Sequence, residues 1–405
     1  MFKVTNLPFE VKSVFGRFRD EFTAPSFESM TQLASALICS EKRRNVSGLH
    51  KTILGGKSRT AYEYFFHDAK WDEDSIAQRM ADYFFEKYNV GPGDRVFLSV
   101  DDTFVEKRGD ETEGVGEFYD YSEDRYINGN NFVTSCIQFG EDYIPHKSKM
   151  YLKEDAAEAM DEEFRTKLEI AYDEMIEPLE LPEGAELYVL FDCGYYSKDL
   201  LGDIKDLGYV AVCKLRKDKK IIVNGKEMNV CNLVDDLDYE RIEVEIRGRE
   251  KNYNVSGRKV EIPELGEVKL VASKEGDEKD PYYLISTDLD LSCEEIVKMY
   301  ENRWNIETAH REANQKFGFK EYQMRGKEAI ERFMQIAFLA WTVIKFALAS
   351  GKDFEEIIDE MKIGEILDKI KLLYLIEMVM AVGKIWKASD SREELVERLA
   401  DLFWN

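Results

Sequence analysis

Two aspartates, Asp101 and Asp192, stand at the ends of apolar segments, VFLSV and ELYVLF, that the residue pattern predicts as buried strands. In open α/β sheets the reacting groups gather beyond the carboxyl ends of the strands, so these two carboxylates could lie close together. Asp102 follows Asp101 directly. Because a strand alternates its faces, only one of these neighbouring aspartates should point into such a site, and the other would serve the turn or support the site from behind.

A predicted helix carries the third candidate carboxylate. A capping box at residues 292–295 opens it, and the helical pattern continues to about residue 316. At 100° per residue, one face of this helix gathers five polar side chains: Tyr300, Arg303, Glu307, Arg311 and Asn314. Such a face suits an acidic metal ligand flanked by donors to phosphate. The alternative is a solvated helix in which Arg303 and Glu307 form an i,i+4 pair worth about 0.2–0.5 kcal/mol.

Three carboxylates from two strand ends and one helix would suit hard divalent cations. Mg²⁺ prefers carboxylate oxygens and keeps several waters, so no histidine or cysteine ligand is needed. The four histidines form no zinc-like cluster: His50, His67, His146 and His310. Two divalent ions about 3.5–4 Å apart can activate a water or a 3′-hydroxyl and stabilise the leaving oxygen of a phosphodiester. These residue types therefore favour metal-dependent phosphodiester chemistry.

The composition indicates a large globular protein with an acidic surface. Its 405 residues are 44% hydrophobic and carry a formal net charge of −25, which argues against a nonspecific nucleic-acid coat or a polybasic membrane binder. The six cysteines include no C-x-x-C pair, and neither an export signal nor a membrane-spanning apolar run is visible. We therefore expect a cytoplasmic protein without membrane segments, whose DNA contacts are local.

Helical spacing predicts a small N-terminal domain over residues 1–94. Within it, residues 41–60 carry six basic side chains, including Arg43 and Arg44, against one acid. Two short helices separated by a glycine-containing turn would fit a helix-turn-helix that offers a helix N-terminus to phosphates. A solvated loop is the equal alternative.

The rest of the chain predicts a mixed sheet with helices on its faces. Segments 114–122 and 131–140 suggest an antiparallel hairpin, and a helix is expected over residues 155–177. Short segments joined by Gly, Asn and Asp turns predict a β-rich insertion over residues 220–290. The remainder of the sequence has helical spacing.

Four motifs together resemble those of a known family. Tyr300-x2-Arg303-x3-Glu307, followed by FGFKEYQMRG at residues 317–326, resembles the Tyr-Arg-Glu-Lys signature of bacterial and archaeal insertion-sequence DDE transposases. VDDTFVEKRG at residues 100–109, the segment 114–122 and LFDCGYYSKDLL at residues 190–201 are similar to the first and second aspartate motifs of the same group. The similarity spans roughly residues 40–345.

The resemblance implies an RNase H-like catalytic core, with a β-rich domain inserted between the second aspartate and the glutamate. The expected parts are a helical DNA-binding domain (1–94), the first part of the core (95–219), the insertion (220–290), the rest of the core with the glutamate helix (291–345), and a helical C-terminal region (346–405).

The resemblance also implies roles for single residues. Asp101, Asp192 and Glu307 would be catalytic and would bind two Mg²⁺ or Mn²⁺ ions, and the motif match favours Asp101 over Asp102. Tyr300 and Arg303 would hold phosphates of the transposon end. Together with the cations near the motifs, the candidate DNA contacts are Tyr300, Arg303, Arg311, Asn314, Lys107, Arg43 and Arg44.

The sequence departs from the family pattern at the lysine of the signature. That lysine is expected seven residues after the glutamate, where this chain has Asn314. Lys316 is predicted to face away from the site. Our hypothesis is that Arg311, on the same face as Glu307, supplies the missing cation.

The resemblance implies a cut-and-paste transposase. Such an enzyme binds the terminal inverted repeats of its element, hydrolyses DNA at both ends and joins the freed 3′-hydroxyls to target DNA. Pairing two ends implies at least a dimer in the active complex. Two alternatives stay open: a stand-alone RNase H-like DNA nuclease, and a catalytically decayed or domesticated DNA-binding relic.

Overall fold

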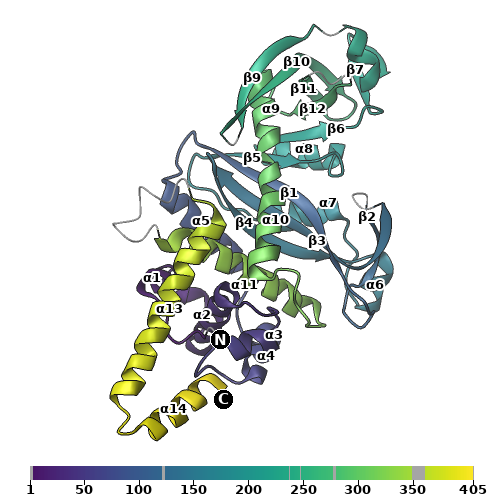
Figure 1. Ribbon diagram of the computed structural model, residues 1–405. Helices are drawn as coiled ribbons and strands as arrows, with labels where there is room; N and C mark the ends of the chain where they lie inside the picture. The colour runs from purple at the N-terminus through teal and green to yellow at the C-terminus, as the bar shows by residue number, and fades with distance from the viewer. Residues whose placement is uncertain are drawn as a thin grey trace.

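The computed structural model describes residues 3–120, 124–236, 238–246, 248–276, 280–348 and 361–404. Within these residues, one mixed sheet of twelve strands runs through the molecule, with helices packed against it and helical segments at both ends of the chain (Figure 1). The strand order is β2-β3-β1-β5-β6-β12-β11-β10-β7-β8, with β4 paired to β3 and β9 to β10. This architecture confirms the expected mixed α/β sheet flanked by helices.

The strands are β1 (Arg95–Glu106), β2 (Gly116–Asp120), β3 (Arg125–Phe139), β4 (Asp142–Tyr151), β5 (Glu186–Phe191), β6 (Val210–Leu215), β7 (Lys220–Val223), β8 (Lys226–Asn229), β9 (Glu240–Ile246), β10 (Arg249–Ile262), β11 (Gly266–Glu275) and β12 (Tyr282–Ser286).

The helices are α1 (Phe9–Gly16), α2 (Ala24–Cys39), α3 (Val46–Thr52), α4 (Arg59–His67), α5 (Glu73–Tyr88), α6 (Glu154–Ala159), α7 (Lys167–Ile170), α8 (Lys198–Asp206), α9 (Cys293–Asn302), α10 (Trp304–Phe317), α11 (Lys327–Ala347), α13 (Ile363–Lys387) and α14 (Arg392–Trp404). Short 3-10 segments, η1 (Arg19–Glu21) and η3 (Val230–Asp236), and one π-helical segment, η2 (Ala171–Ile176), accompany them.

Strand β1 is longer than the sequence predicts. It pairs in parallel with β5 only as far as Ser99 opposite Leu190, but its antiparallel pairing with β3 continues to Glu106 opposite Gly129. The expectation that β1 ends at the carboxylates is therefore wrong, because its pairing with β5 stops before them and its pairing with β3 continues past them. If the parallel register is continued by two positions, Asp192 falls beside Asp101.

The expected hairpin is present as β2 and β3, although β3 begins at Arg125 and residues 121–123 lie outside the described part. The prediction of a single helix over residues 155–177 is wrong. The segment is divided into α6, α7 and the π-helical segment, because Asp161 has a φ of 56° and a capping box at Thr166 and Glu169 starts a new helix.

The strands expected over residues 220–290 are present, and they extend the sheet of the core. β12 pairs antiparallel with β6, so β7 to β12 continue outward from the strands that carry the aspartates. Helix α9 packs across β5, β6 and β12, with Leu190, Val212 and Leu284 in one apolar cluster beneath it. The glutamate helix is thereby held over both parts of the sheet.

The helical pair predicted in the basic segment is present as α3 and α4. Asn45 caps α3 through Gly48 N, and Ser58 caps α4 through Ala61 N at 3.2 Å. Helix α11 joins these N-terminal helices to the sheet, since it contacts α1, α2, α4, α5, α10 and β4, and nearly all of its side chains are buried.

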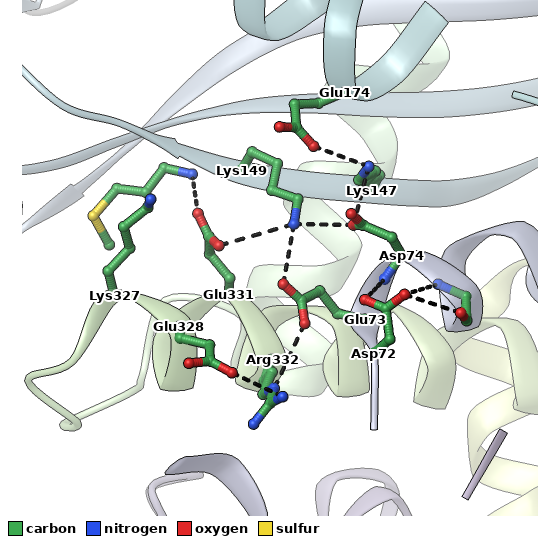
Figure 2. A network of polar contacts seen from close by, with 12 residues as sticks. Asp72, Glu73, Asp74, Lys147, Lys149, Glu174, Lys327, Glu328, Glu331 and Arg332 are labelled. Carbon is green, nitrogen blue, oxygen red and sulfur yellow. Dashed lines mark hydrogen bonds and ion pairs between the residues drawn. The ribbon is translucent and has the colours of Figure 1, made fainter. Parts of the chain in front are cut away.

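A network of buried charges fixes this junction (Figure 2). Lys149 Nζ on β4 lies 3.0 Å from Glu73 Oε1 and 2.9 Å from Asp74 Oδ1, both at the start of α5, and 4.0 Å from Glu331 Oε2 of α11. Glu331 also accepts a hydrogen bond from Met150 N at 2.7 Å. Strand β4 was not predicted from the sequence, since its segment contains Pro145 and two inward-facing lysines. Carboxylates from three other segments make those lysines tolerable.

The C-terminal helices extend away from the sheet (Figure 1). The first half of α13 buries Ile366, Leu367, Ile370 and Tyr374, and the Tyr374 hydroxyl donates to Ser35 Oγ at 2.6 Å. Residues 349–360 of the expected C-terminal region lie outside the described part. Among the residues that are described, no helix has the length and apolar character needed to cross a membrane.

We predict that Lys149→Met destabilises the protein by about 3–5 kcal/mol, because the substitution leaves Glu73, Asp74 and Glu331 close together without their shared cation. Urea unfolding followed by circular dichroism would measure the loss. The control is Lys220→Met, which removes only an exposed pair with Glu227 and should change stability by less than about 0.5 kcal/mol. Equal losses in the two variants would contradict the structural role of the network.

Candidate active site

The glutamate helix crosses the sheet as two segments, α9 and α10, that meet at Arg303. The predicted capping box is present: the Ser292 hydroxyl accepts from Glu295 N at 3.1 Å, and the Glu295 carboxylate accepts from Ser292 N at 2.9 Å. The expected single helix is interrupted at Arg303, because Arg303 N and Ile306 N donate to carbonyls only three residues back. Segment α10 then lies over β1, β3 and β4.

Arg303 links this helix to the sheet at Asp101. Its Nη1 lies 3.1 Å from Asp101 Oδ2, and its Nη2 lies 3.0 Å from Glu307 Oε1. The Arg303 side chain is only 12% exposed, so the two ion pairs are largely shielded from water and stronger than surface pairs. One guanidinium thus holds two of the three carboxylates that the sequence singles out.

Asp192 lies directly after β5, on the parallel neighbour of β1. Its Oδ1 accepts a hydrogen bond from Gly194 N at 2.7 Å, and a Cβ at position 194 would lie 2.9 Å from the same oxygen. A side chain at position 194 would therefore push the Asp192 carboxylate away from its present place. The charge of Asp192 raises the pKa of both Asp101 and Tyr300, so it belongs to the same group of side chains.

Burial raises the pKa of Asp101 to about 7. The charge of Arg303 opposes this shift, and the nearby charges of Asp102 and Asp192 add to it. Near neutral pH, Asp101 is thus divided between its protonated and ionised forms. Such a raised carboxyl pKa is typical of a site that gathers like charges for a function.

Asp102 points to a different set of partners. Its Oδ2 lies 2.7 Å from Lys167 Nζ and accepts from Asn131 Nδ2 at 3.0 Å. The alternation of faces along β1 separates it from Asp101, which forms the ion pair with Arg303 of the glutamate helix. This geometry agrees with the choice of Asp101, although the assignment itself stays a prediction.

His310 and Thr134 fasten α10 to the sheet beneath the carboxylates, a contact that sequence reasoning missed. The Thr134 hydroxyl donates to Asp101 O at 3.0 Å, and His310 Nε2 lies 2.6 Å from the same hydroxyl. Because a hydroxyl has one proton, His310 Nε2 must be the donor in that contact. Burial lowers the pKa of His310 to about 3, so the ring is neutral and serves to position Glu307 one turn earlier. His310 follows Glu307 by three residues and so lies on the same helix face, which was the sequence signal that could have identified it.

The remaining polar residues of the predicted helix face fall into two groups. Arg303 lies against the ring of Tyr300, and burial raises the pKa of Tyr300 to about 12, so its hydroxyl stays protonated. Arg311, in contrast, is exposed, its Nη2 lies 3.5 Å from Thr308 Oγ1, and it lines a groove beyond α10. Asn314 is half-buried. The contacts bring Arg303 to the carboxylates and do not bring Arg311 there.

Two of the three cations proposed outside the helix make internal contacts. Lys107 Nζ donates to Tyr322 O at 3.1 Å and lies over the Tyr322 ring, and burial lowers the pKa of Lys107 to about 8. Arg44 pairs with Glu321 through its backbone N, at 2.7 Å, and its guanidinium, at 3.3 Å. Arg43 stays exposed. Lys107 and Arg44 therefore help to fix the segment after α10, and their role in DNA binding is untested.

Lys320 is a cation that the sequence analysis did not single out. It is half-buried and lines a cavity of about 460 Å³ beside β1, β2 and β3, together with Asp102, Glu106 and Asp120. Burial lowers the pKa of Lys320, and its charge helps to lower that of His310. No carboxylate in the described part of the chain lies within 4.0 Å of its Nζ. Because the segment follows the end of α10 at Gly318, the folded turn rather than the helical period brings Lys320 here.

The donor set fits hard divalent cations, since Asp101, Asp192 and Glu307 offer only carboxylate oxygen. In the residues that the structure describes, no three Asp, Glu, His or Cys side chains are arranged as ligands of one ion. The guanidinium of Arg303 lies between Asp101 and Glu307 and pairs with both. The chemistry of the donors therefore suits the predicted metal, and Arg303 would have to yield for all three carboxylates to meet.

A mixed sheet with two aspartates on adjacent parallel strands, crossed by a helix with a glutamate, defines an α/β protein of RNase H-like type. A family model for the DDE superfamily endonuclease matches residues 17–229, which is more than half of the chain. The chain belongs to this family. A second family model, for the transposase DDE domain, matches residues 170–343. No curated protein matches the chain. The two models support a nuclease or transposase enzyme.

We predict that Asp101 titrates with a pKa near 7 in the metal-free protein, and that Arg303→Met raises this pKa further, because the charge of Arg303 favours the ionised carboxylate. ¹³C NMR of protein labelled at aspartate carboxyl carbons would measure both values. Since the ordinary value is 3.8, the protonated form stabilises the fold, and that contribution is lost as the pH rises through about 7.

The control for this titration is Arg311→Met, which should leave the pKa of Asp101 unchanged. A value near 4 in the wild type, or a lower value in Arg303→Met, would contradict the geometry of the site.

Proposed function

We propose that this chain is a transposase that cuts the ends of an insertion sequence and joins them to target DNA by phosphodiester hydrolysis and transesterification. Asp101, Asp192 and Glu307 would be the catalytic carboxylates and would bind two divalent cations, Mg²⁺ or Mn²⁺. The observation that best supports this is the Arg303 contact, which ties the glutamate helix to Asp101 beside the end of β5. The transposase model agrees, since it spans both Asp192 and Glu307.

The side chains around the carboxylates suit a phosphodiester substrate. Bound cations would supply activation of the attacking hydroxyl and stabilisation of the leaving oxygen. Arg303 offers a planar fork that matches a phosphate as well as it matches a carboxylate. A phosphodiester in the site would therefore compete for Arg303, and the exchange would free Asp101 and Glu307 to bind cations. Tyr300 would add a neutral donor to the same phosphate.

Lys320 is our candidate for a further contact to the cut strand. Most cations beside the carboxylates already have acidic partners, as Lys167 does in Asp102. Lys320 faces a cavity beside β1, β2 and β3 and has no such partner within 4.0 Å in the described residues. A half-buried lysine that makes no direct ion pair with the described carboxylates of its cavity can form one with a phosphate. Lys320, rather than Arg311, would then supply the positive charge of the signature lysine, which Asn314 replaces in this chain.

The DNA would include the terminal inverted repeats of the element and the target duplex. Because the net charge of −25 repels duplex DNA, binding would depend on focused cations, among them the exposed Arg43 and Arg311, and would weaken steeply with salt.

Each of two ends needs a catalytic site, so the active complex would contain at least two copies. We place this activity in the cytoplasm, where cellular DNA is accessible.

We predict that Asp192→Asn lowers Mg²⁺-dependent cleavage and joining by at least about 100-fold, because it removes a metal ligand, and leaves binding to the bordering DNA nearly unchanged. The assay uses purified protein and a duplex that carries the DNA flanking the gene. Cleavage without joining by the wild type would favour the stand-alone nuclease. Binding without either reaction would favour the decayed relic.

We predict that Lys320→Gln weakens binding to the same duplex and lowers the slope of log affinity against log salt by about 1, because one phosphate contact is lost. Lys320→Arg should keep both quantities, since the charge is retained. The matched control is Lys316→Gln, which alters a lysine in the groove beyond α10. An unchanged salt slope in Lys320→Gln would rule out the contact.

A further inference from the structure

A long groove follows helix α5 where the N-terminal helices meet the sheet. Two cavities, of about 440 Å³ and about 540 Å³, share Asp82 and Glu180 and so form one continuous groove. Along α5 it runs from the N-cap Asp72 to the C-cap Asn89, which is about 25 Å at the helical rise. Residues 174–182, which precede β5, form the opposite wall. Cavities of this size are typical of small-molecule sites.

Contacts between the two walls fix the shape of the groove. Gln78 Nε2 on α5 donates to Glu180 O at 3.1 Å, and Glu180 N donates to Gln78 Oε1 at 3.1 Å. Deeper in the groove, Lys147 Nζ lies 3.0 Å from Asp74 Oδ1 and 3.2 Å from Glu174 Oε2 (Figure 2). The groove is therefore formed before any ligand arrives, which lowers the cost of binding.

The groove carries more negative than positive charge. Arg79 and Lys147 are the cations among the described residues that line the first cavity. Six carboxylates line it with them: Glu21, Asp72, Asp74, Asp82, Glu174 and Glu180. Burial raises the pKa of Glu21, and three nearby aspartates add to this shift although the charge of Arg79 opposes it. A cationic ligand would relieve the repulsion among these carboxylates.

A buried histidine also faces the groove. His146 of β4 lines the first cavity, although only 3% of the residue is exposed. Its Nδ1 lies 2.9 Å from Ser135 Oγ, and the Ser135 hydroxyl donates its single proton to Met175 Sδ, so Nδ1 is a donor and Nε2 is left as an acceptor. Burial lowers the pKa of His146 to about 3, which keeps the ring neutral. No described group lies within hydrogen-bonding distance of Nε2. This nitrogen can therefore accept a hydrogen bond from a ligand.

Apolar side chains lie between the carboxylates. Ala77 and Leu179 line the first cavity, and Phe85, Val90 and Leu181 line the second. Such a surface suits methylene groups between cationic groups that are spread along a chain. A metal ion fits less well, because in the described residues no three Asp, Glu, His or Cys side chains are arranged as ligands of one ion. An extended peptide would bring backbone groups as well, and neither wall is a strand that could pair with them.

We propose that the groove along α5 binds a linear aliphatic polyamine, with its ammonium groups on the carboxylates and on His146 Nε2 and its methylene groups on the apolar side chains. The ligand would bridge α5 and residues 174–182, and so would stabilise the junction that the buried charges around Lys149 form. The proposal does not rest on the proposed function, because none of the candidate catalytic residues lines the groove.

The test is a calorimetric titration of the full chain, free of DNA, with spermidine as the probe. We expect one site per chain and a melting temperature that rises with spermidine concentration. Butylamine, which has a single ammonium group, should bind at least about 10-fold more weakly, because it reaches fewer carboxylates.

A pair of variants locates the site. Glu180→Gln should lower the affinity for spermidine by about 3- to 30-fold, because it removes one carboxylate. The Glu180 side chain is exposed and makes no hydrogen bond or ion pair within the described part of the chain, so the fold should be kept. The matched control is Glu177→Gln, which removes the same charge from an exposed position outside the groove lining and should leave the affinity unchanged.

NMR of protein labelled with ¹⁵N at histidine follows the buried ring directly. Spermidine should shift the Nε2 resonance of His146 and leave those of His50 and His67 in place. An unmoved His146 resonance on spermidine binding would place the ligand elsewhere and overturn the proposal.

Two further results would also contradict it. Equal stabilisation by MgCl₂ and spermidine at one ionic strength, with the two glutamate variants alike, would mean general screening of an acidic protein. Binding of oligolysine without binding of spermidine would mean that the occupant is a polypeptide.

Discussion

The register of β1 against its two neighbours is the constraint on which the site depends. Asp101 faces the glutamate helix and Asp102 faces Lys167 because successive side chains on a strand alternate. A slip of one residue between β1 and β3 would exchange these two carboxylates and would also turn Val96, Leu98 and Val100 out of the core. The hydrophobic pattern that stabilises the sheet is therefore the same feature that selects which aspartate meets Arg303.

The buried charges between β4, α5 and α11 determine how the N-terminal helices are positioned on the sheet. Burying Lys147 and Lys149 is costly, and the nearby carboxylates offset the cost only when the N-terminal helices are docked in one position. An apolar contact would tolerate sliding, whereas ion pairs with Asp74 and Glu331 require a particular alignment. The network therefore sets how the helical N-terminal part sits on the sheet, and so where the exposed Arg43 lies relative to the carboxylates.

Sequence patterns located the parts of the site that follow local rules and missed those that depend on tertiary contact. The strands before Asp101 and Asp192 and the capping box at Ser292 depend on nearby residues, and the structure has them as expected. Strand β4 was missed because partners distant in sequence compensate its lysines. Lys107 and Arg44 were read as exposed cations, but their partners, Tyr322 and Glu321, lie more than two hundred residues away. The turn at Gly318 likewise brings Lys320 to β1 without any periodic signal.

An acidic protein that handles DNA must keep its few useful cations from being neutralised by its own carboxylates. Near the candidate site, Lys167 and Arg303 are paired with acids. Pairing of this kind lowers affinity for random duplex, because a phosphate must displace a carboxylate that is already in place. At Arg303 the displaced partners are Asp101 and Glu307, which are the carboxylates that the proposed chemistry needs. Under the proposed function, a correctly placed phosphodiester would therefore assemble the cation site by removing its internal competitor, and DNA that fails to reach Arg303 would leave that site closed.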